Sequence, residues 1–227
     1  MSGEVKLPRR KYYSPLRADQ ARATRRRVLD AALRLFVERG YAGTTIAAVA
    51  QEAAVSAETV YGAFGGKRGL LEGVIETAIT GEDEEATGDE AWWAELARVP
   101  DGRGRLERMV EYSCRILART RLIHAVIRGA ADKEPFAAAL GTRLLHDRLA
   151  GQTERIRRYL RGELREGLSV PDAGQRYCAL ASPELYHVLT VEFGWTPDQH
   201  RAWLTGLLES ELLAPPRGRR DGPAAAP

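Results

Sequence analysis

Residues 44–67 constrain the fold of this chain more than any other stretch, because they predict two short helices joined by a tight turn. Thr45 can cap the first helix, since a threonine oxygen accepts a hydrogen bond from the free amides of a first helical turn. Apolar residues then recur at i, i+3, i+4 and i+7, which places them on one helix face. They are Ile46, Val49, Ala50 and Ala53. The pattern breaks over residues 54–56, where the turn is expected.

The second helix of this stretch is expected over residues 57–64. Ser56 can cap it, and the preceding Val55 is apolar and can point into the core. Within the helix, Val60 and Phe64 are four residues apart and face inwards. The residues left on the outer face are small or polar, with one tyrosine: Ala57, Glu58, Thr59, Tyr61 and Gly62. A short helix with such an outer face has the form of the recognition helix in a helix-turn-helix.

On these motifs, residues of roughly 20 to 80 resemble the DNA-binding domain of the tetracycline-repressor (TetR) family of bacterial transcriptional regulators. The matching residues are Phe36-Val37-Glu38-Arg39-Gly40-Tyr41, Thr44-Thr45, Val55-Ser56, Thr59-Val60-Tyr61, Phe64 and Lys67. Because so many positions match in register, the resemblance is specific. One departure is Ala54, which stands where the family usually has glycine in the turn. If this residue is left-handed, alanine costs about 1 kcal/mol there.

Charge is distributed unevenly along the chain, although the formal net charge is only +3. Residues 1–70 contain 13 lysines and arginines against 6 acidic residues, a net charge of +7. Residues 71–214 contain 18 against 24, a net charge of −6, and the remaining residues add +2. A basic end joined to an acidic body is typical of a protein whose one end meets phosphate. The alternative is a solvated surface of mixed charge.

Composition excludes a membrane protein and a disulfide-rich protein. No run of residues approaches the ~18 apolar positions that span a bilayer, and the amino terminus lacks the apolar region of a signal peptide. We therefore expect a cytoplasmic protein without membrane contact. Cys114 and Cys178 have neither metal-ligand spacing nor the pattern of a small disulfide framework. They are expected to be reduced thiols, with a redox-sensor role as the alternative.

An enzyme is not expected either. Catalysis needs converging groups, such as paired carboxylates, a nucleophile beside a base, or suitably spaced metal ligands. The four histidines have no metal-pair spacing, and the sequence contains neither a phosphate-binding glycine loop nor a G-x-S-x-G motif. We therefore expect no catalytic residue, no metal site and no cofactor.

The expected architecture is all-α, with an amino-terminal three-helix helix-turn-helix DNA-binding domain and a carboxyl-terminal helical domain for ligand binding and dimerisation. The expected segments are a disordered basic arm (1–19), the helix-turn-helix domain (20–66), a linking helix (67–80), an acidic loop and connector (81–100), the effector-binding and dimerisation domain (101–213) and a disordered tail (214–227). The arm is either a solvated leader or a segment that lies on DNA.

Helical periodicity and caps predict where the helices of these segments lie. The first is expected from Gln20 to Arg39 and the linking helix from Arg68 to Ile79. In the body we expect an apolar stripe over residues 106–117, a separate apolar segment over 122–131, a long helix from Pro135 that ends at Gly167, and further helices over 172–181, 183–193 and 197–213. The last has a capping box at Thr196 and Gln199.

The last two helices are the usual dimer surface in the family that this chain resembles, where they form a four-helix bundle with the partner. Their apolar faces contain Leu185, Val188, Leu189, Trp203, Leu204, Leu207 and Leu208. The alternative is that these residues form only an intramolecular core. Dimerisation is favoured because one helix-turn-helix covers little DNA, whereas symmetric dimers read paired half-sites.

The resemblance also implies which residues meet an operator. The first helix approaches the DNA backbone with arginines such as Arg25, and Thr44, Thr45, Tyr61 and Lys67 hold the backbone. Lys67 lies near a helix amino terminus, which favours an anion, although an ordinary solvated lysine is the alternative. The residues expected to cap or approach the bases are Ser56, Ala57, Glu58, Thr59 and Gly62.

The resemblance further implies that the body binds a small molecule between its helices and thereby releases the DNA. Candidate pocket residues are the polar or soft members of apolar stripes: Met109, Tyr112, Ser113, His124 and Tyr177. Plain core packing is the alternative for each. The expected function is that of a homodimeric transcriptional regulator that binds a palindromic operator. We expect a repressor, because repression is usual in the family that the chain resembles. The other possibility is an effector-free helical dimer that acts through a protein partner or binds DNA without specificity.

Overall fold

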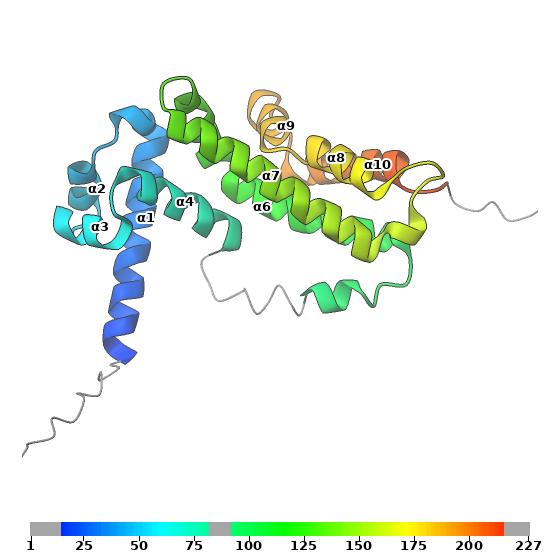
Figure 1. Ribbon diagram of the computed structural model, residues 1–227, viewed down its shortest axis with the longest axis horizontal. Helices are drawn as coiled ribbons and strands as arrows, with labels where there is room; N and C mark the ends of the chain where they lie inside the picture. Colours follow the sequence, from blue (N-terminus) through cyan, green and yellow to red (C-terminus); the bar gives the residue numbers. More distant parts are fainter. Residues whose placement is uncertain (1–14, 82–91, 216–227) are drawn as a thin grey trace, which may run out of the picture.

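The computed structural model describes residues 15–81 and 92–215, and Figure 1 shows how their helices are arranged. The elements are α1 (Pro15–Gly43), α2 (Ile46–Glu52), α3 (Ala57–Phe64), α4 (Lys67–Thr80), α6 (Gly102–Ala131), α7 (Pro135–Tyr159), the 3₁₀ turn η1 (Arg161–Glu163), α8 (Val170–Leu180), α9 (Pro183–His187), the π-helical turn η2 (Val188–Glu192) and α10 (Pro197–Leu212). A short helical segment also covers residues 92–96. The expected all-α fold class is confirmed.

Two long antiparallel helices, α6 and α7, run along the molecule and connect its two ends (Figure 1). Asp101 caps α6 by accepting a hydrogen bond from the Gly104 amide at 2.8 Å. The apolar segment 122–131, which we expected to be separate, is the second half of this helix. Helix α7 ends at Tyr159, before the expected end at Gly167. Leu160 leaves the helical conformation, and Leu164 pairs with Leu213 as an isolated β-bridge.

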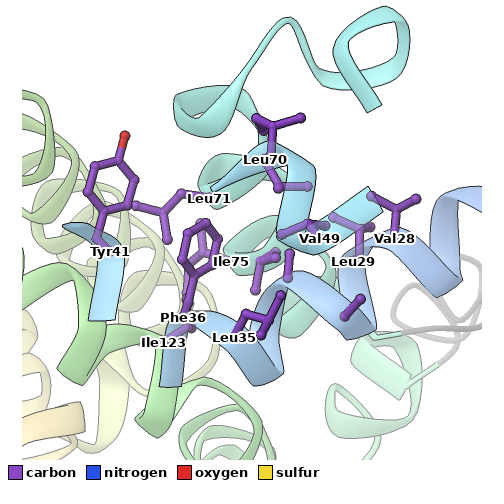
Figure 2. Close-up of a cluster of buried hydrophobic side chains, with 14 of the residues drawn as sticks. Val28, Leu29, Leu35, Phe36, Tyr41, Val49, Leu70, Leu71, Ile75 and Ile123 are labelled. Atoms are coloured by element: carbon purple, nitrogen blue, oxygen red, sulfur yellow. The ribbon is translucent and has the colours of Figure 1, made fainter. Parts of the chain in front are cut away.

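The amino-terminal helices α1 to α4 enclose one hydrophobic cluster, part of which Figure 2 shows. Its largest fully buried side chains in these helices are Phe36 of α1 and Leu70 and Leu71 of α4. The same cluster contains Ile123 of α6 and Leu140 of α7 (the former labelled in Figure 2). The core of the amino-terminal end therefore continues into the body, and the two ends are not packed as independent units.

A second cluster fills the other half of the α6–α7 pair, where α8, α9 and α10 cover it. Its fully buried side chains include Leu106, Met109, Ile156, Leu160, Tyr177, Leu204, Leu208 and Leu212. The boundary between the two cores thus crosses α6 and α7 themselves. A movement of these two helices would act on both cores.

The amino-terminal boundary differs from the expectation. Helix α1 begins at Pro15, so residues 15–19, expected to be disordered, are helical. At the other end, Gly40 has φ 69° and interrupts the helix where the sequence predicted its stop, and one further turn reaches Gly43. Residues 1–14 of the expected arm, residues 82–91 of the expected acidic loop and residues 216–227 of the expected tail lie outside the described residues.

No helix of the described ranges combines the length and the apolar character that crossing a bilayer requires. In the same ranges, no three His, Cys, Asp or Glu side chains come together as a set of metal ligands.

Candidate nucleic-acid interface

Side-chain caps fix the starts of both helices in the expected helix-turn-helix. The Thr45 hydroxyl oxygen accepts from the Ala48 amide at 3.1 Å, and the Ser56 hydroxyl oxygen accepts from the Thr59 amide at 3.2 Å. Both caps follow from residue types that favour this position, and both expectations are confirmed. Helices α2 and α3 therefore start at the residues that the sequence indicated.

The turn between α2 and α3 contains Ala54 in the left-handed conformation, with φ 53°. It is the one residue other than glycine with positive φ in the part of the chain that the structure describes. The amide of Ala54 donates to the Gln51 carbonyl at 3.2 Å and that of Val55 donates to the Ala50 carbonyl at 3.0 Å. The turn is therefore formed in spite of the alanine, whose Cβ atom makes this conformation unfavourable.

Ala54→Gly is expected to raise the free energy of unfolding by roughly 1 kcal/mol, because glycine adopts the left-handed conformation without the steric cost. Chemical denaturation of both proteins would measure the difference. The control is Ala202→Gly at an exposed helical position of α10, which is expected to lower stability by about 1 kcal/mol. Equal losses in the two variants would contradict the strain at Ala54.

Four of the five residues expected on the outer face of α3 are exposed: Glu58, Thr59, Tyr61 and Gly62. Ala57 is half-buried against the amino-terminal cluster, and its contact with DNA stays a prediction. Hydrogen bonds from its own backbone amide and from the Ser56 hydroxyl lower the pKa of Glu58. Glu58 is therefore ionised at the positive end of the α3 dipole, where its charge is favourable.

Thr44 was expected to hold the DNA backbone, and this prediction was wrong for its side chain. Thr44 is 1% exposed. Its hydroxyl lies 3.0 Å from the Leu35 carbonyl oxygen and 2.9 Å from the Gly40 carbonyl oxygen, to which it can donate. The hydroxyl satisfies carbonyl groups left open where α1 is interrupted at Gly40, and so it stabilises the end of α1 instead of facing solvent.

The Lys67 side chain is also engaged inside the domain. Its ammonium group donates to the Tyr41 carbonyl at 2.8 Å and lies 4.3 Å from the centre of the Tyr41 ring. A cation beside terminal helix carbonyls is stabilising, so Lys67 ties the start of α4 to the end of α1. An ammonium group has three donors, and the residue is only half-buried. A role at phosphate therefore stays a prediction, but an ordinary solvated lysine is not what the structure contains.

Arg25 is exposed on α1, and its guanidinium group lies 4.5 Å from the centre of the Phe64 ring. Phe64 is the last residue of α3. The cation–π contact therefore places a basic side chain of α1 beside the end of the expected recognition helix. Arg25 keeps its place as a candidate phosphate contact.

Two glycines of α4 bring this helix unusually close to α3. A Cβ atom at Gly69 would lie 2.0 Å from the Phe64 carbonyl oxygen, and a Cβ atom at Gly73 would lie 3.1 Å from the Phe64 ring. Both positions were missed as functional candidates. The available signal was two glycines inside one predicted helix, which lowers helix propensity and so indicates a packing reason. The position of α3 therefore depends on α4.

The comparisons with known proteins agree on this domain. A sequence model described as bacterial regulatory proteins, tetR family, matches residues 28–74, which include α2, α3 and most of the surrounding core. Over residues 28–74, the chain is therefore similar to the tetR family of bacterial regulatory proteins. The uncharacterized HTH-type transcriptional regulator YvkB of Bacillus subtilis (strain 168) is 43% identical over 54 residues. That match covers 24% of this chain and 29% of YvkB.

Solved structures share the fold over most of the chain. NalD of Pseudomonas aeruginosa, described as the secondary repressor of the MexAB-OprM multidrug efflux pump, is 18% identical with a TM-score of 0.64, covering 89% of this chain and 100% of NalD. A putative transcriptional regulator from Saccharomonospora viridis, solved in complex with choline, is 24% identical with a TM-score of 0.63, covering 85% and 99%. At these identities, the likeness shows a shared fold and does not identify a ligand of this chain.

The candidate pocket residues of the body do not form one site. Met109 belongs to the second core. The Ser113 and Tyr177 hydroxyl groups lie 3.0 Å apart, and the Gln152 side-chain amide donates to Ser113 at 3.3 Å. Burial raises the pKa of Tyr177 well above its usual value, so its hydroxyl remains protonated. These residues form a buried polar contact between α6, α7 and α8.

Tyr112 lies in an aromatic cluster with Trp92 and Trp93, whose ring centres are 5.0 and 5.1 Å from its own. The Arg155 guanidinium group lies 4.8 Å from the centre of the Trp93 ring and 5.5 Å from that of Tyr112. The two tryptophans therefore pack on the body.

His124 is separate from the other four candidates and lines a groove between α6, α7 and α9. Burial above all, with contributions from Arg148 and Arg128 that outweigh the opposite effect of Glu184, lowers the pKa of His124 to about 4. The imidazole is therefore neutral at pH 7. Of the five candidate residues, His124 is the one that lines this groove.

This pKa predicts how stability depends on pH. The pKa of an unfolded histidine is about 6.5, so folding favours the neutral form of His124. Its contribution is complete above that pH and is lost as the pH falls towards 4. His124→Gln cannot titrate, so its melting temperature should fall less over this range than that of the unchanged protein. The control is His146→Gln, at an exposed position of α7. Parallel curves for all three proteins would contradict the prediction.

The expected dimer residues divide into two groups. Leu189, Leu204 and Leu208 are buried in their own chain, so the prediction that they form the dimer surface was wrong for these three. Leu204 and Leu208 fill the second core because α10 turns that face towards α6 and α8. Leu189 is buried on η2. Leu185, Trp203 and Leu207 are half-buried, and Val188 is exposed. Val191 and Phe193, which the sequence did not single out, are exposed on η2 and directly after it.

Proposed function

We propose that the protein is a transcriptional regulator that binds a palindromic DNA operator as a homodimer and is released by a small-molecule effector. In this proposal, residues 20–66 bind DNA, residues 67–80 link the two ends, and residues 101–213 bind the effector and dimerise. Repression is the simplest outcome, because a bound dimer blocks access to its operator until the effector arrives.

The observation that carries the proposal is the outer face of α3. Tyr61 is 55% exposed, and its side chain makes no hydrogen bond or ring contact within the described residues. The fold thus does not use this large side chain, whereas Val60 beside it is fully buried. A capped helix with an unused polar and aromatic face suits docking in a major groove. The net charge of +7 in residues 1–70 supports phosphate as the partner.

The dimer is supported by exposed apolar side chains near the carboxyl terminus. Val188, Val191 and Phe193 are 37%, 47% and 67% exposed on the same short segment. Neighbouring exposed apolar side chains mark interaction surfaces. Symmetric dimers read two half-sites about 34–36 Å apart, so a few ångströms of spreading between the recognition helices would lose the second half-site.

Effector release is supported by the contacts between α4 and the body. Arg119 of α6 donates to the Ile79 carbonyl at 3.0 Å, and Arg143 of α7 forms an ion pair with Glu72 at 2.8 Å. A shift of α6 or α7 would therefore move α4, and with it α3. The complex of the Saccharomonospora viridis protein with choline supports the proposal that a protein of this fold takes a small molecule.

Selection of bound fragments from a random or genomic DNA pool, at near-physiological salt, tests the proposal. We expect one two-fold symmetric sequence to be recovered. Recovery of none, from protein that is folded and dimeric, would contradict specific operator binding. Weak binding that depends steeply on salt concentration and not on DNA sequence would favour the alternative. In that alternative, the protein is an effector-free dimer that binds DNA non-specifically or acts through a protein partner.

A further inference from the structure

The groove at His124 has the size and walls of a small-molecule site. Its volume is about 350 Å³, and its walls come from α6, α7 and the first turn of α9. Most of the lining is apolar, with Ile127 and Ala137 on the buried side. Leu145 is 47% exposed at the edge, which is unusual for a leucine. Ligand pockets of this size typically combine an apolar lining with a few placed polar groups.

The polar groups of the groove leave one positive charge uncompensated. Arg128 forms an ion pair with Glu184 at 3.1 Å, so these two charges balance. Arg148 donates through Nε to the Cys178 sulfur at 3.3 Å. No carboxylate pairs with Arg148 anywhere in residues 15–81 and 92–215. The third basic group, His124, is neutral at pH 7, so the net charge of the lining is +1.

We propose that this groove binds a small amphipathic monoanion, an apolar chain or ring with a single carboxylate, and that Arg148 holds the carboxylate. The single negative charge of the ligand would balance the positive charge of Arg148. The planar N–H donors of a guanidinium group suit a carboxylate. The apolar part of the ligand lies against Ile127, Ala137 and Leu145. This inference rests on the proposed function, because it names the class of the effector.

An ion pair in the lining connects the proposed ligand site to helix α9. Glu184 is in the first turn of α9, and its ion pair with Arg128 connects α9 to α6. A second carboxylate in the groove competes with Glu184 for Arg128. Helix α9 continues into η2, which carries the exposed Val188 and Val191. Ligand binding would thus alter the segment that we propose as the dimer surface.

Calorimetric titration of the full chain without DNA tests the site directly. The probe is octanoate, below the concentration at which it aggregates, with octanamide and octylammonium as matched neutral and cationic probes. We expect octanoate to bind at least about tenfold more tightly than either, because a charge-assisted hydrogen bond contributes more than a neutral one.

Three variants locate the binding. Arg148→Gln should weaken octanoate about tenfold or more, whereas Arg148→Lys should retain part of the affinity. Glu184→Gln should tighten it, because the competing carboxylate is gone. The control is Arg157→Gln on the same helix, where Arg157 pairs with Glu154 outside the groove. Melting temperatures without ligand check that each variant is folded.

Two results would overturn the inference: equal affinities for octanoate and octanamide, or equal losses in Arg148→Gln and Arg157→Gln. Absence of octanoate binding to the folded, unchanged protein would overturn it too. These failures leave the proposed function intact if a symmetric operator has been selected. Conversely, octanoate that binds with the expected pattern but does not release that operator supports the site and contradicts effector release.

Discussion

Replacing Gly69 by alanine is expected to lower the free energy of unfolding by about 3 kcal/mol or more and to abolish operator binding. The added Cβ atom would lie 2.0 Å from the Phe64 carbonyl oxygen, well inside any permitted contact. This oxygen belongs to the backbone at the end of α3, so no side-chain rotation relieves the clash. Either α3 moves away from α4 or the turn between them rearranges.

Both responses damage the same site, because Phe64 is where three helices meet. Its ring packs against Gly73 of α4, and Arg25 of α1 lies over it. A displaced α3 therefore loses its contacts with α4 and its place beside the basic side chains of α1. DNA binding should fall more steeply than stability does, because half-site reading depends on where α3 points.

Denaturation curves and operator titrations would measure both effects in Gly69→Ala. The control is Gly129→Ala, a glycine in the interior of α6 at which a Cβ atom would meet nothing within 4 Å. That change should stabilise the protein by about 1 kcal/mol, the difference in helix propensity. A Gly69→Ala protein with normal stability and normal operator affinity would show that the α3–α4 contact is looser than the structure has it.

Local signals in the sequence predicted the helix-turn-helix well, because caps and short-range periodicity determine it. Thr45, Ser56 and the buried face of α2 are in place as expected, and Ala54 has the left-handed conformation whose cost the sequence analysis considered. These features depend on residues within one or two helical turns of each other. The fold class follows from the same local patterns repeated along the chain.

The predictions failed where long-range packing decides the role of a residue. The Thr44 hydroxyl faces carbonyl groups of α1, a pairing that depends on how α1 and α2 meet. Leu204 and Leu208 have the pattern of a dimer surface, yet α10 turns them towards α6 and α8. Amphipathic periodicity predicts that a face is buried but does not say whether the chain itself or a second copy covers it.

Tyr61→Ala is expected to weaken operator binding by about 2 kcal/mol, roughly 30-fold, while changing the free energy of unfolding by less than about 0.5 kcal/mol. The two effects separate because the ring is 55% exposed and contacts no partner ring within the described residues. Large aromatic side chains supply much of the binding energy at interfaces, and here the fold does not already use it.

The neighbouring residue is the matched contrast. Val60 is fully buried beneath α3, so Val60→Ala should cost about 2 kcal/mol of stability, with any loss of DNA binding following from unfolding. Tyr61→Phe separates the hydroxyl from the ring: full affinity would assign the contact to the ring, and the affinity of Tyr61→Ala would assign it to the hydroxyl. If Tyr61→Ala binds the selected operator as well as the unchanged protein does, the outer face of α3 is not the DNA-reading surface, and the proposal loses the observation that carries it.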